Sequence, residues 1–261
     1  MNKIVTIHSF RQSVGKSTLA ANLAVLLAKQ GRRVGLVDTD FQGASAHLFF
    51  NLHEPRGTFN DFMLGKCDAQ QTVHDISEQI GAELPGKLFL SPASTQITDI
   101  MQMLKLTMNI ERYTEGLTSL EKDLALDILL VDTQAGLSEN TLMSIALSQT
   151  LLLVLHPARQ DFQGTAVTVD VARKLQVPTI HLVLNDTSPN LDEAEATQQL
   201  WQNYQCDGVI LPHAEELAAL GSSQPFVLAY PPHARKGQFL APGLPEHPLT
   251  ARLETLADLV L

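Results

Sequence analysis

Three consecutive residues near the start of the chain have the types needed to hold a phosphate group. Gly15, Lys16 and Ser17 match the second half of the motif G-x-x-x-x-G-K-[ST]. In this motif backbone N–H groups surround the phosphates, the lysine neutralises their charge and the hydroxyl binds Mg²⁺. Phe10 stands where the motif has its first glycine. The sequence therefore keeps the charged part of a phosphate-binding loop and alters the part that shapes it.

The residues on either side of this loop predict a strand before it and a helix after it. Residues 3–8 form a short β-branched run, and residues 18–30 place leucines at helical spacing before Gly31. A helix N-terminus presents unpaired N–H groups and a positive dipole end to an anion. We therefore expect the whole segment to bind phosphate, that is Arg11, Gln12, Ser13, Val14, Gly15, Lys16, Ser17 and Thr18.

Carboxylates follow two further predicted strands. Asp38 and Asp40 come at the end of an apolar run, and their spacing puts both side chains on one side of an extended chain. Asp132 ends the apolar run 128–131, as a Walker B carboxylate does. Beside a Mg²⁺-bound phosphate, such acids can hold the metal's water or orient an attacking water. We therefore expect all three near the phosphate loop.

The order of the elements predicts an α/β fold with a doubly wound, mostly parallel sheet and helices on both faces. Apolar runs predict six more strands, at residues 34–37, 87–91, 127–132, 151–155, 179–184 and 208–211. Helical spacing occurs between them, at residues 165–175 and 193–204. Ligands of such sheets bind at the carboxyl ends of the strands, so the loop and the carboxylates are predicted to share one site.

Two sequence features predict the structure at the end of the chain, a segment rich in glycine and proline and an apolar pattern at helical spacing. Residues 220–248 contain many glycines and prolines and predict a long ordered loop. Residues 249–261 predict a helix that lacks the basic face and aromatic anchors of a membrane-surface helix, so we expect it to pack on the body.

Composition favours one domain, residues 1–261, in the cytoplasm. The sequence has no apolar stretch of about eighteen residues and no signal-peptide pattern. Cys67 and Cys206 lack C-x-x-C partners, which argues against a disulfide framework, a zinc site or an iron–sulfur cluster within one chain.

The formal net charge of −10 argues against a protein that wraps extensively around nucleic acid. This charge does not exclude a local basic patch that binds nucleic acid. The alternative interpretation of the basic residues is ordinary solvated surface. The candidates for such a patch are Arg173 with Lys174, Arg235 with Lys236, and Arg252.

Taken together, the motifs resemble the ParA/MinD family of deviant Walker ATPases. The resemblance rests on Gly-Lys-Ser at 15–17, Val-Asp-Thr-Asp-Phe-Gln-Gly at 37–43 and Leu-Val-Asp-Thr-Gln-Ala-Gly at 130–136. It continues at residues 90–94, which look like the family's strand-end segment, and at residues 211–213 and 221–225, which look like its adenine-side loop. It implies a doubly wound P-loop fold that binds ATP and Mg²⁺ and forms a homodimer when ATP is bound.

The resemblance also implies roles for individual residues. Lys16 would bind the β- and γ-phosphates and Asp40 would orient the hydrolytic water. Ser17 would ligate Mg²⁺, and Asp38 and Asp132 would hold its water shell. On the adenine side, the residues implied are Asn185, Pro212 and His213.

The chain departs from the family at the loop's first lysine, which in the family reaches the partner's ATP across the dimer. Arg11 takes that position, and Gln12 and Ser13 replace the two glycines after it. A guanidinium is permanently charged and suited to bidentate phosphate contact, so Arg11 can serve as the trans cation. Arg159, in the loop after the strand at 151–155, is the alternative source. The loss of glycine also restricts the φ values of the loop, which can slow catalysis.

A deviant loop without its usual lysine, in an acidic chain, is similar to the carboxysome-positioning ATPases called McdA, with plasmid and chromosome partition ATPases as near neighbours. This resemblance implies slow ATP hydrolysis stimulated by a protein adaptor, nonspecific DNA binding with nucleoid association, and no membrane partner. A non-hydrolysing ATP-binding scaffold and a metabolic P-loop ligase are the alternatives. A nitrogenase-like reductase is disfavoured by the missing cysteine pairs.

Overall fold

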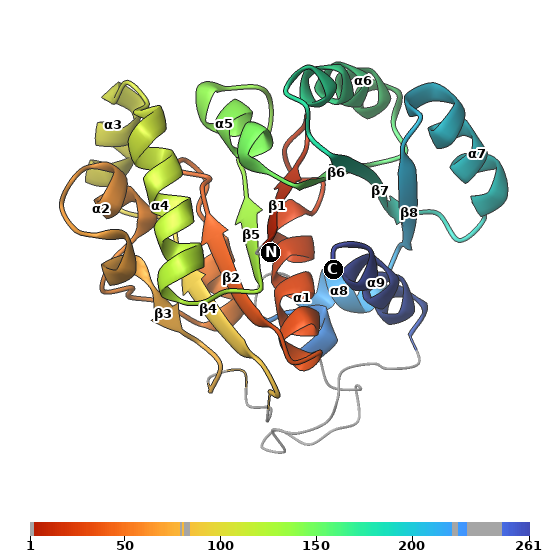
Figure 1. Ribbon diagram of the computed structural model, residues 1–261. Helices are drawn as coiled ribbons and strands as arrows, with labels where there is room; N and C mark the ends of the chain where they lie inside the picture. Colours follow the sequence, from red (N-terminus) through yellow and green to blue (C-terminus); the bar gives the residue numbers. More distant parts are fainter. Residues whose placement is uncertain (1–2, 79, 81–83, 221–223, 229–246) are drawn as a thin grey trace.

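The computed structural model describes residues 3–78, 80, 84–220, 224–228 and 247–261 (Figure 1). Within these residues, eight strands form one sheet in the order β3-β4-β2-β5-β1-β6-β7-β8, and β3 alone is antiparallel to its neighbour. The strands are β1 (Lys3–His8), β2 (Arg33–Asp38), β3 (His74–Asp75), β4 (Lys87–Ser91), β5 (Ile128–Asp132), β6 (Thr150–Leu155), β7 (Thr179–Thr187) and β8 (Asp207–Pro212). The prediction of a mostly parallel sheet is confirmed.

Helices connect the strands. They are α1 (Lys16–Lys29), α2 (Phe59–Met63), α3 (Ile97–Lys105), α4 (Ile110–Asp123), α5 (Glu139–Leu147), α6 (Arg159–Lys174), α7 (Glu193–Tyr204), α8 (Glu215–Leu220) and α9 (Pro248–Leu259). The part of the chain with assigned structure contains no helix that is both long enough and apolar enough to cross a membrane.

Buried side chains alternate between the two faces of the sheet, and helices cover both faces as predicted. Along β1, Val5 and Ile7 pack with α1 and α9, whereas Ile4 belongs to the cluster under α2 and α4. A third cluster lies between the β6–β7–β8 side of the sheet and the helices α6 and α7. This alternation follows from the period of two in a strand and leaves the carboxyl ends of the strands as the polar edge.

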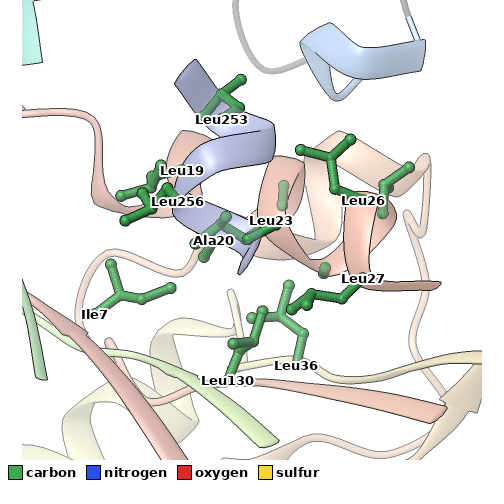
Figure 2. Packing of buried hydrophobic residues seen from close by; sticks show 14 of the residues in the cluster. Ile7, Leu19, Ala20, Leu23, Leu26, Leu27, Leu36, Leu130, Leu253 and Leu256 are labelled. Carbon is green, nitrogen blue, oxygen red and sulfur yellow. The ribbon is translucent and has the colours of Figure 1, made fainter. Parts of the chain in front are cut away.

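Helix α1 is the central support of the phosphate loop because it is buried from both sides. Figure 2 shows Leu19, Leu23 and Leu27 of α1 between the sheet and α9, whose Leu253 and Leu256 close the other side. The helix begins at Lys16, two residues before the predicted start, and Gly31 with a φ of 85° follows its end. The prediction that the last helix packs on the body is confirmed.

Two predictions differ from the structure for physical reasons. The strand β3 was missed because two residues carry no periodic signal. Helix α6 begins at Arg159, six residues before its predicted start, because its first turn is polar and faces the loop edge. The predicted long loop falls largely on residues 221–223 and 229–246, outside the described part of the chain, and so does most of the predicted adenine-side segment 221–225.

Strand register brings the predicted carboxylates together. Strand β5 lies between β1 and β2, with Asp132 opposite both Ile7 and Asp38. Because all three strands run parallel, their carboxyl ends meet at one edge, where the phosphate loop leaves β1. Residues 38, 132 and 9 therefore become neighbours although they are far apart in sequence.

Candidate functional site

The phosphate loop joins β1 to α1 through residues with unusual backbone angles. Gly15 is the N-cap of α1 and has a φ of 93°, in the left-handed region that favours glycine. A Cβ at this position would also lie 2.5 Å from Nδ2 of Asn185. Ser13 has a φ of 59° despite its side chain, so the loop keeps a left-handed turn where the family has glycine. The altered sequence therefore still closes a curved loop onto the helix N-terminus.

Lys16 lies inside this loop. Its ammonium group is buried and donates a hydrogen bond of 3.0 Å to Oγ of Ser9, whose hydroxyl in turn donates to the carbonyl of Arg11. Burial lowers the pKa of Lys16, while Asp132, Asp40 and Asp38 oppose the shift. A buried cation surrounded by three carboxylates is held ready for an anionic ligand.

A cavity of about 690 Å³ opens in front of Lys16. It brings together the phosphate loop, the segment after β2 and the segment after β5. Its lining residues are Gln12, Ser13, Gly15, Lys16, Ser17, Thr18, Asp40, Gln42, Gly43, Ser45, Phe49, Gln134 and Ala135. Most of the predicted phosphate-loop residues therefore face one space, together with Asp40.

Asp132 is fully buried, and neither of its carboxylate oxygens has a hydrogen-bond partner among the described residues. Burial, and then the neighbouring Asp38, raise its pKa to about 8, while Ser17 and Lys16 act in the opposite direction. Buried polar groups are nearly always satisfied, so an orphaned carboxylate requires an explanation. A cation at this point would satisfy it.

Asp38 is also fully buried, but its oxygens accept bonds from the backbone. Oδ1 accepts from the N–H of Asp40 at 3.0 Å, and Oδ2 accepts from Ser45 at 3.0 Å and Ala46 at 3.1 Å. Burial nevertheless raises its pKa to about 6. Asp38 thus holds the segment after β2 in shape, a contact that the sequence did not predict.

Asp40 projects from that segment toward the cavity. Its Oδ1 accepts from the N–H of Gly43 at 2.8 Å and of Gln42 at 3.3 Å, which fixes the carboxylate in a tight turn. A Cβ at Gly43 would lie 3.3 Å from Oδ2 of Asp40, so glycine leaves the carboxylate uncrowded. Asp40 is the carboxylate of the three that lines the open space.

Ser17 and Asp132 are the donors that best fit a Mg²⁺ ion. Oxygen ligands are what this hard cation prefers, and it usually takes one or two carboxylates besides substrate phosphate and water. The unpartnered oxygens of Asp132 and the hydroxyl of Ser17 at the cavity wall meet this description. Asp38 has one oxygen with spare accepting capacity beside them.

The two residues that depart most from the family motif both dock on α6. Nη1 of Arg11 lies 3.1 Å from Oδ1 of the buried Asp161 in the first turn of that helix. The ring of Phe10 packs on Gly164 one turn further on, where a Cβ would lie 2.0 Å from Cδ1 of the ring. The phosphate loop is therefore clamped to α6 within the same chain.

This clamp bears on the two candidate trans cations. Arg11 is half exposed and its partner in this structure is intramolecular. Arg159 is exposed at the first position of α6 and is not among the residues that line the cavity. Which of the two reaches a partner's phosphate stays a prediction.

Of the predicted adenine-side residues, Asn185 contacts the phosphate loop, whereas Pro212 and His213 lie against β7 and the residues at its end. Nδ2 of Asn185 donates to the carbonyl of Val14 at 2.9 Å. Pro212 ends β8 opposite Thr187, and Nδ1 of His213 lies 2.5 Å from Oδ1 of Asp186, which raises the pKa of His213. Only Asn185 of the three touches the loop directly in these contacts.

Several residues of the site were missed by sequence reasoning. Ser9 positions Lys16, and Asp161 holds Arg11 while its other oxygen accepts from the N–H of His156 at 3.0 Å. Gln134 and Ala135 line the cavity. A signal existed for Asp161, a lone acid in the first turn of a helix that starts at the carboxyl edge, but its partner is 150 residues away.

Two of the candidates for a basic patch, Arg173 and Arg252, have partners within the chain. Arg173 donates to the carbonyl of Tyr204, and Arg252 pairs with Glu193, so both have internal partners. Arg235 and Lys236 lie outside the described residues. Cys67 is half-buried and Cys206 is buried, and the described residues contain no group of three His, Cys, Asp or Glu side chains placed to hold a metal.

Comparison with known proteins gives the family of the chain. Residues 1–258 match the family described as ParA, NUBPL iron-transfer P-loop NTPase. An uncharacterized ATP-binding protein of Methanocaldococcus jannaschii is 27% identical over 231 residues, covering 87% of this chain and 81% of that protein.

Two solved structures share the fold. The septum site-determining protein MinD of Pyrococcus horikoshii, complexed with Mg-ADP, superposes with a TM-score of 0.78 at 20% identity and covers 100% of this chain and 96% of its own. Apo McdA of Cyanthece superposes with a TM-score of 0.75 at 16% identity, covering 100% and 99%.

Proposed function

The chain belongs to the ParA/MinD family of P-loop NTPases, and from this premise we propose that it is an ATP-hydrolysing switch that dimerises on ATP and positions a cargo. The cargo would be a carboxysome, a plasmid or a chromosomal region, held through nonspecific DNA binding and released when an adaptor stimulates hydrolysis. One observation carries the ATPase part of the proposal. Lys16 and Asp40 line a single cavity at a helix N-terminus, and the buried carboxylates of Asp38 and Asp132 lie close enough for their charges to act on Lys16.

The division of labour among these groups follows from their surroundings. Lys16 and the N–H groups at the start of α1 would bind the outer phosphates. Ser17, Asp132 and Asp38 would hold Mg²⁺, which when bound neutralises phosphate charge and orients the phosphates for in-line attack. Asp40 would orient the attacking water, because its carboxylate faces the cavity and is fixed by two backbone N–H groups.

Dimerisation would act on the clamp between the phosphate loop and α6. For Arg11 to reach a partner's phosphate, its ion pair with Asp161 must open. Opening the pair leaves the buried carboxylate of Asp161 with its bond from the N–H of His156, and it frees the half-exposed guanidinium of Arg11 to contact a triphosphate. Arg159, two residues before Asp161, remains the alternative trans cation.

The decisive experiment measures nucleotide binding and phosphate release by the full chain. We expect Mg²⁺-dependent ATP binding and slow release of phosphate, and we expect Asp40→Ala to abolish release while binding persists. Asp123→Ala, an exposed acid at the end of α4, is the matched control and should behave as the unmodified protein. If the unmodified protein binds ATP but releases no phosphate, so that Asp40→Ala changes nothing, the protein is a non-hydrolysing scaffold instead. If it releases phosphate and Asp40→Ala releases it equally fast, the role proposed for Asp40 is wrong.

The DNA part is tested separately. Filter retention of random-sequence duplex at low salt should require ATP and should fall steeply as salt increases, because phosphate contacts release counterions. Retention that is absent at low salt with ATP would remove DNA from the proposal but would leave the ATPase part standing. Adaptor stimulation is then tested with candidate partner proteins and DNA together.

A further inference from the structure

Gln134 is a half-buried side chain at the phosphate site that the proposed chemistry does not use. It lies two residues beyond the end of β5 and lines the same cavity as Lys16 and Asp40. The register of β2 with β5 pairs Asp38 with Asp132. Asp40 and Gln134 each lie two residues further along, so they leave the sheet edge on neighbouring strands and face one space.

The backbone around Gln134 is held by the strands on both sides of β5. On the β2 side, the carbonyl of Asp132 accepts from the N–H of Thr39 at 2.8 Å. On the β1 side, the carbonyl of Ser9 accepts from the N–H of Gly136 at 2.9 Å. Gln134 therefore stands between the segment that follows β2 and the phosphate loop that follows β1.

The residue before Gln134 is fixed as well. The hydroxyl of Thr133 donates to the carbonyl of Ile7 at 3.0 Å, and its Oγ1 lies 2.8 Å from Nδ1 of His8. Thr133 and His8 are both buried. The place of Gln134 is therefore set by contacts to the sheet at the start of its segment.

The amide of Gln134 is oriented by a hydrogen bond to α5. Its Nε2 donates to Oγ of Ser138 at 2.6 Å, and Ser138 is the N-cap of that helix. The N–H of Ser138 donates to Oγ1 of Thr141 at 2.8 Å, which holds the serine in place. No residue that the structure describes donates to Oε1 of Gln134. Because a carboxamide oxygen has two lone pairs, this end of the side chain is available to a ligand in the cavity.

Asp40 also has an oxygen available to a ligand. Its Oδ1 accepts from the N–H groups of Gly43 and Gln42, whereas no described residue donates to its Oδ2. A water that attacks phosphorus must direct a lone pair at it, so both O–H groups of that water must donate elsewhere. The ammonium of Lys16 has donors only and can take neither O–H group. A carboxylate oxygen and a carboxamide oxygen on neighbouring segments supply the two acceptors that this geometry requires.

We propose that Gln134 is a catalytic residue whose Oε1 accepts one O–H group of the attacking water, while Oδ2 of Asp40 accepts the other. The inference rests on the proposed function, since it takes the ligand of the cavity to be ATP. Ser138 is a positioning residue, because its bond to Nε2 keeps the amide from turning its nitrogen toward the water.

The amide of Gln134 gains and loses no proton in this step. The water oxygen forms a bond to the outermost phosphorus. The bond from that phosphorus to the bridging oxygen breaks, and its electron pair leaves on ADP. The proton that faces Asp40 passes to its carboxylate and from there to solvent. The proton that faces Gln134 stays on the new phosphate oxygen, so the products are ADP, hydrogen phosphate and one proton.

Single-turnover phosphate release and nucleotide binding by the full chain separate this role from a contact to the nucleotide. Gln134→Met keeps the length of the side chain and removes the acceptor. We expect the rate of release to fall about 10- to 100-fold, the loss of one hydrogen bond at the transition state. Affinity for Mg²⁺ with the β,γ-imido analogue of ATP should stay within about twofold, because ground-state binding does not use the attacking water. Gln102→Met, at an exposed glutamine of α3, is the matched control and should behave as the unmodified protein.

Two further variants complete the test. Gln134→Glu retains an acceptor oxygen at the same reach, so it should recover part of the rate that Gln134→Met loses. Gln134→Asn takes the place of Gln134→Met if thermal melting shows that the methionine variant does not fold. Its shorter amide cannot contact both Ser138 and the water, so it should show the same selective loss of rate.

The outcomes distinguish this inference from the proposed function. An unchanged rate in Gln134→Met or Gln134→Asn, or an equal loss of rate and of affinity for the analogue, would overturn the catalytic role of Gln134 and leave the ATPase proposal standing. An unmodified protein that binds ATP but releases no phosphate would overturn both.

Discussion

Gly164→Ala tests whether the altered phosphate loop depends on its clamp to α6. A methyl group at position 164 would lie 2.0 Å from Cδ1, 2.2 Å from Cγ and 2.7 Å from Cε1 of Phe10. Carbon atoms prefer separations of about 3.5–4.0 Å, so the ring cannot stay where it is. Phe10 is 40% exposed, which leaves it an open path into solvent.

The magnitude follows from the surface that the ring would lose. A buried phenylalanine hides roughly 150–250 Å², and Phe10 keeps about three fifths of that, or roughly 120 Å². At about 25 cal/mol per Å² its displacement costs at most about 3 kcal/mol. Alanine in place of glycine inside a helix raises the free energy of unfolding by about 0.5–1 kcal/mol. We therefore expect Gly164→Ala to lower the free energy of unfolding by about 2 kcal/mol.

The assay is urea denaturation of a double-mutant cycle. Phe10→Ala removes the ring, so adding Gly164→Ala to it should stabilise the protein by about 0.5–1 kcal/mol instead of destabilising it. Affinity for Mg²⁺ with ADP should fall in Gly164→Ala, because a displaced Phe10 carries the loop with it. If Gly164→Ala has the same sign of effect with and without the ring, the clamp argument is wrong.

Four further outcomes are expected. Lys16→Met should abolish nucleotide binding in calorimetry while thermal melting shows a folded protein, since the methionine fills the space without the charge. Asp161→Asn should cost more stability in urea than Arg11→Gln, because Asp161 is buried and also accepts from the N–H of His156, whereas Arg11 is half exposed. Without nucleotide, the contribution of Asp132 to the free energy of unfolding should fall as pH rises from about 4 to about 8, because the pKa of Asp132 is raised from 3.8 to about 8 and this carboxyl therefore holds more protons in the folded state in that range. The unmodified protein should lose stability relative to Asp132→Asn as pH rises through this range in melts across pH, and a difference that does not change with pH would contradict the assignment.

Short-range patterns in the sequence were sufficient to predict most of the scaffold. The runs of β-branched and leucine residues located seven of the eight strands of the described sheet, because burial on both faces imposes continuous apolar stretches. The phosphate loop after β1, Asp40 after β2 and Asp132 at the end of β5 implied a shared edge, because parallel strands bring their carboxyl ends together. These inferences needed only spacing and residue type.

The partners of the same residues depended on tertiary structure. Arg11 meets Asp161 across 150 residues, and His8 meets Thr133 across 125. The sequence showed that the loop lacks its usual glycines and lysine, but the space for Phe10 is supplied by Gly164 on a different helix. The sequence motif also does not distinguish Asp132 from Asp38. In the structure the carboxylate oxygens of Asp132 have no hydrogen-bond partner among the described residues, whereas those of Asp38 accept backbone N–H groups. Local periodicity shows which side of a segment faces the core. Ion pairs and close packing arise only when distant segments meet. The sequence by itself therefore determined which chemical groups the site contains, and the tertiary structure determined which residues those groups contact.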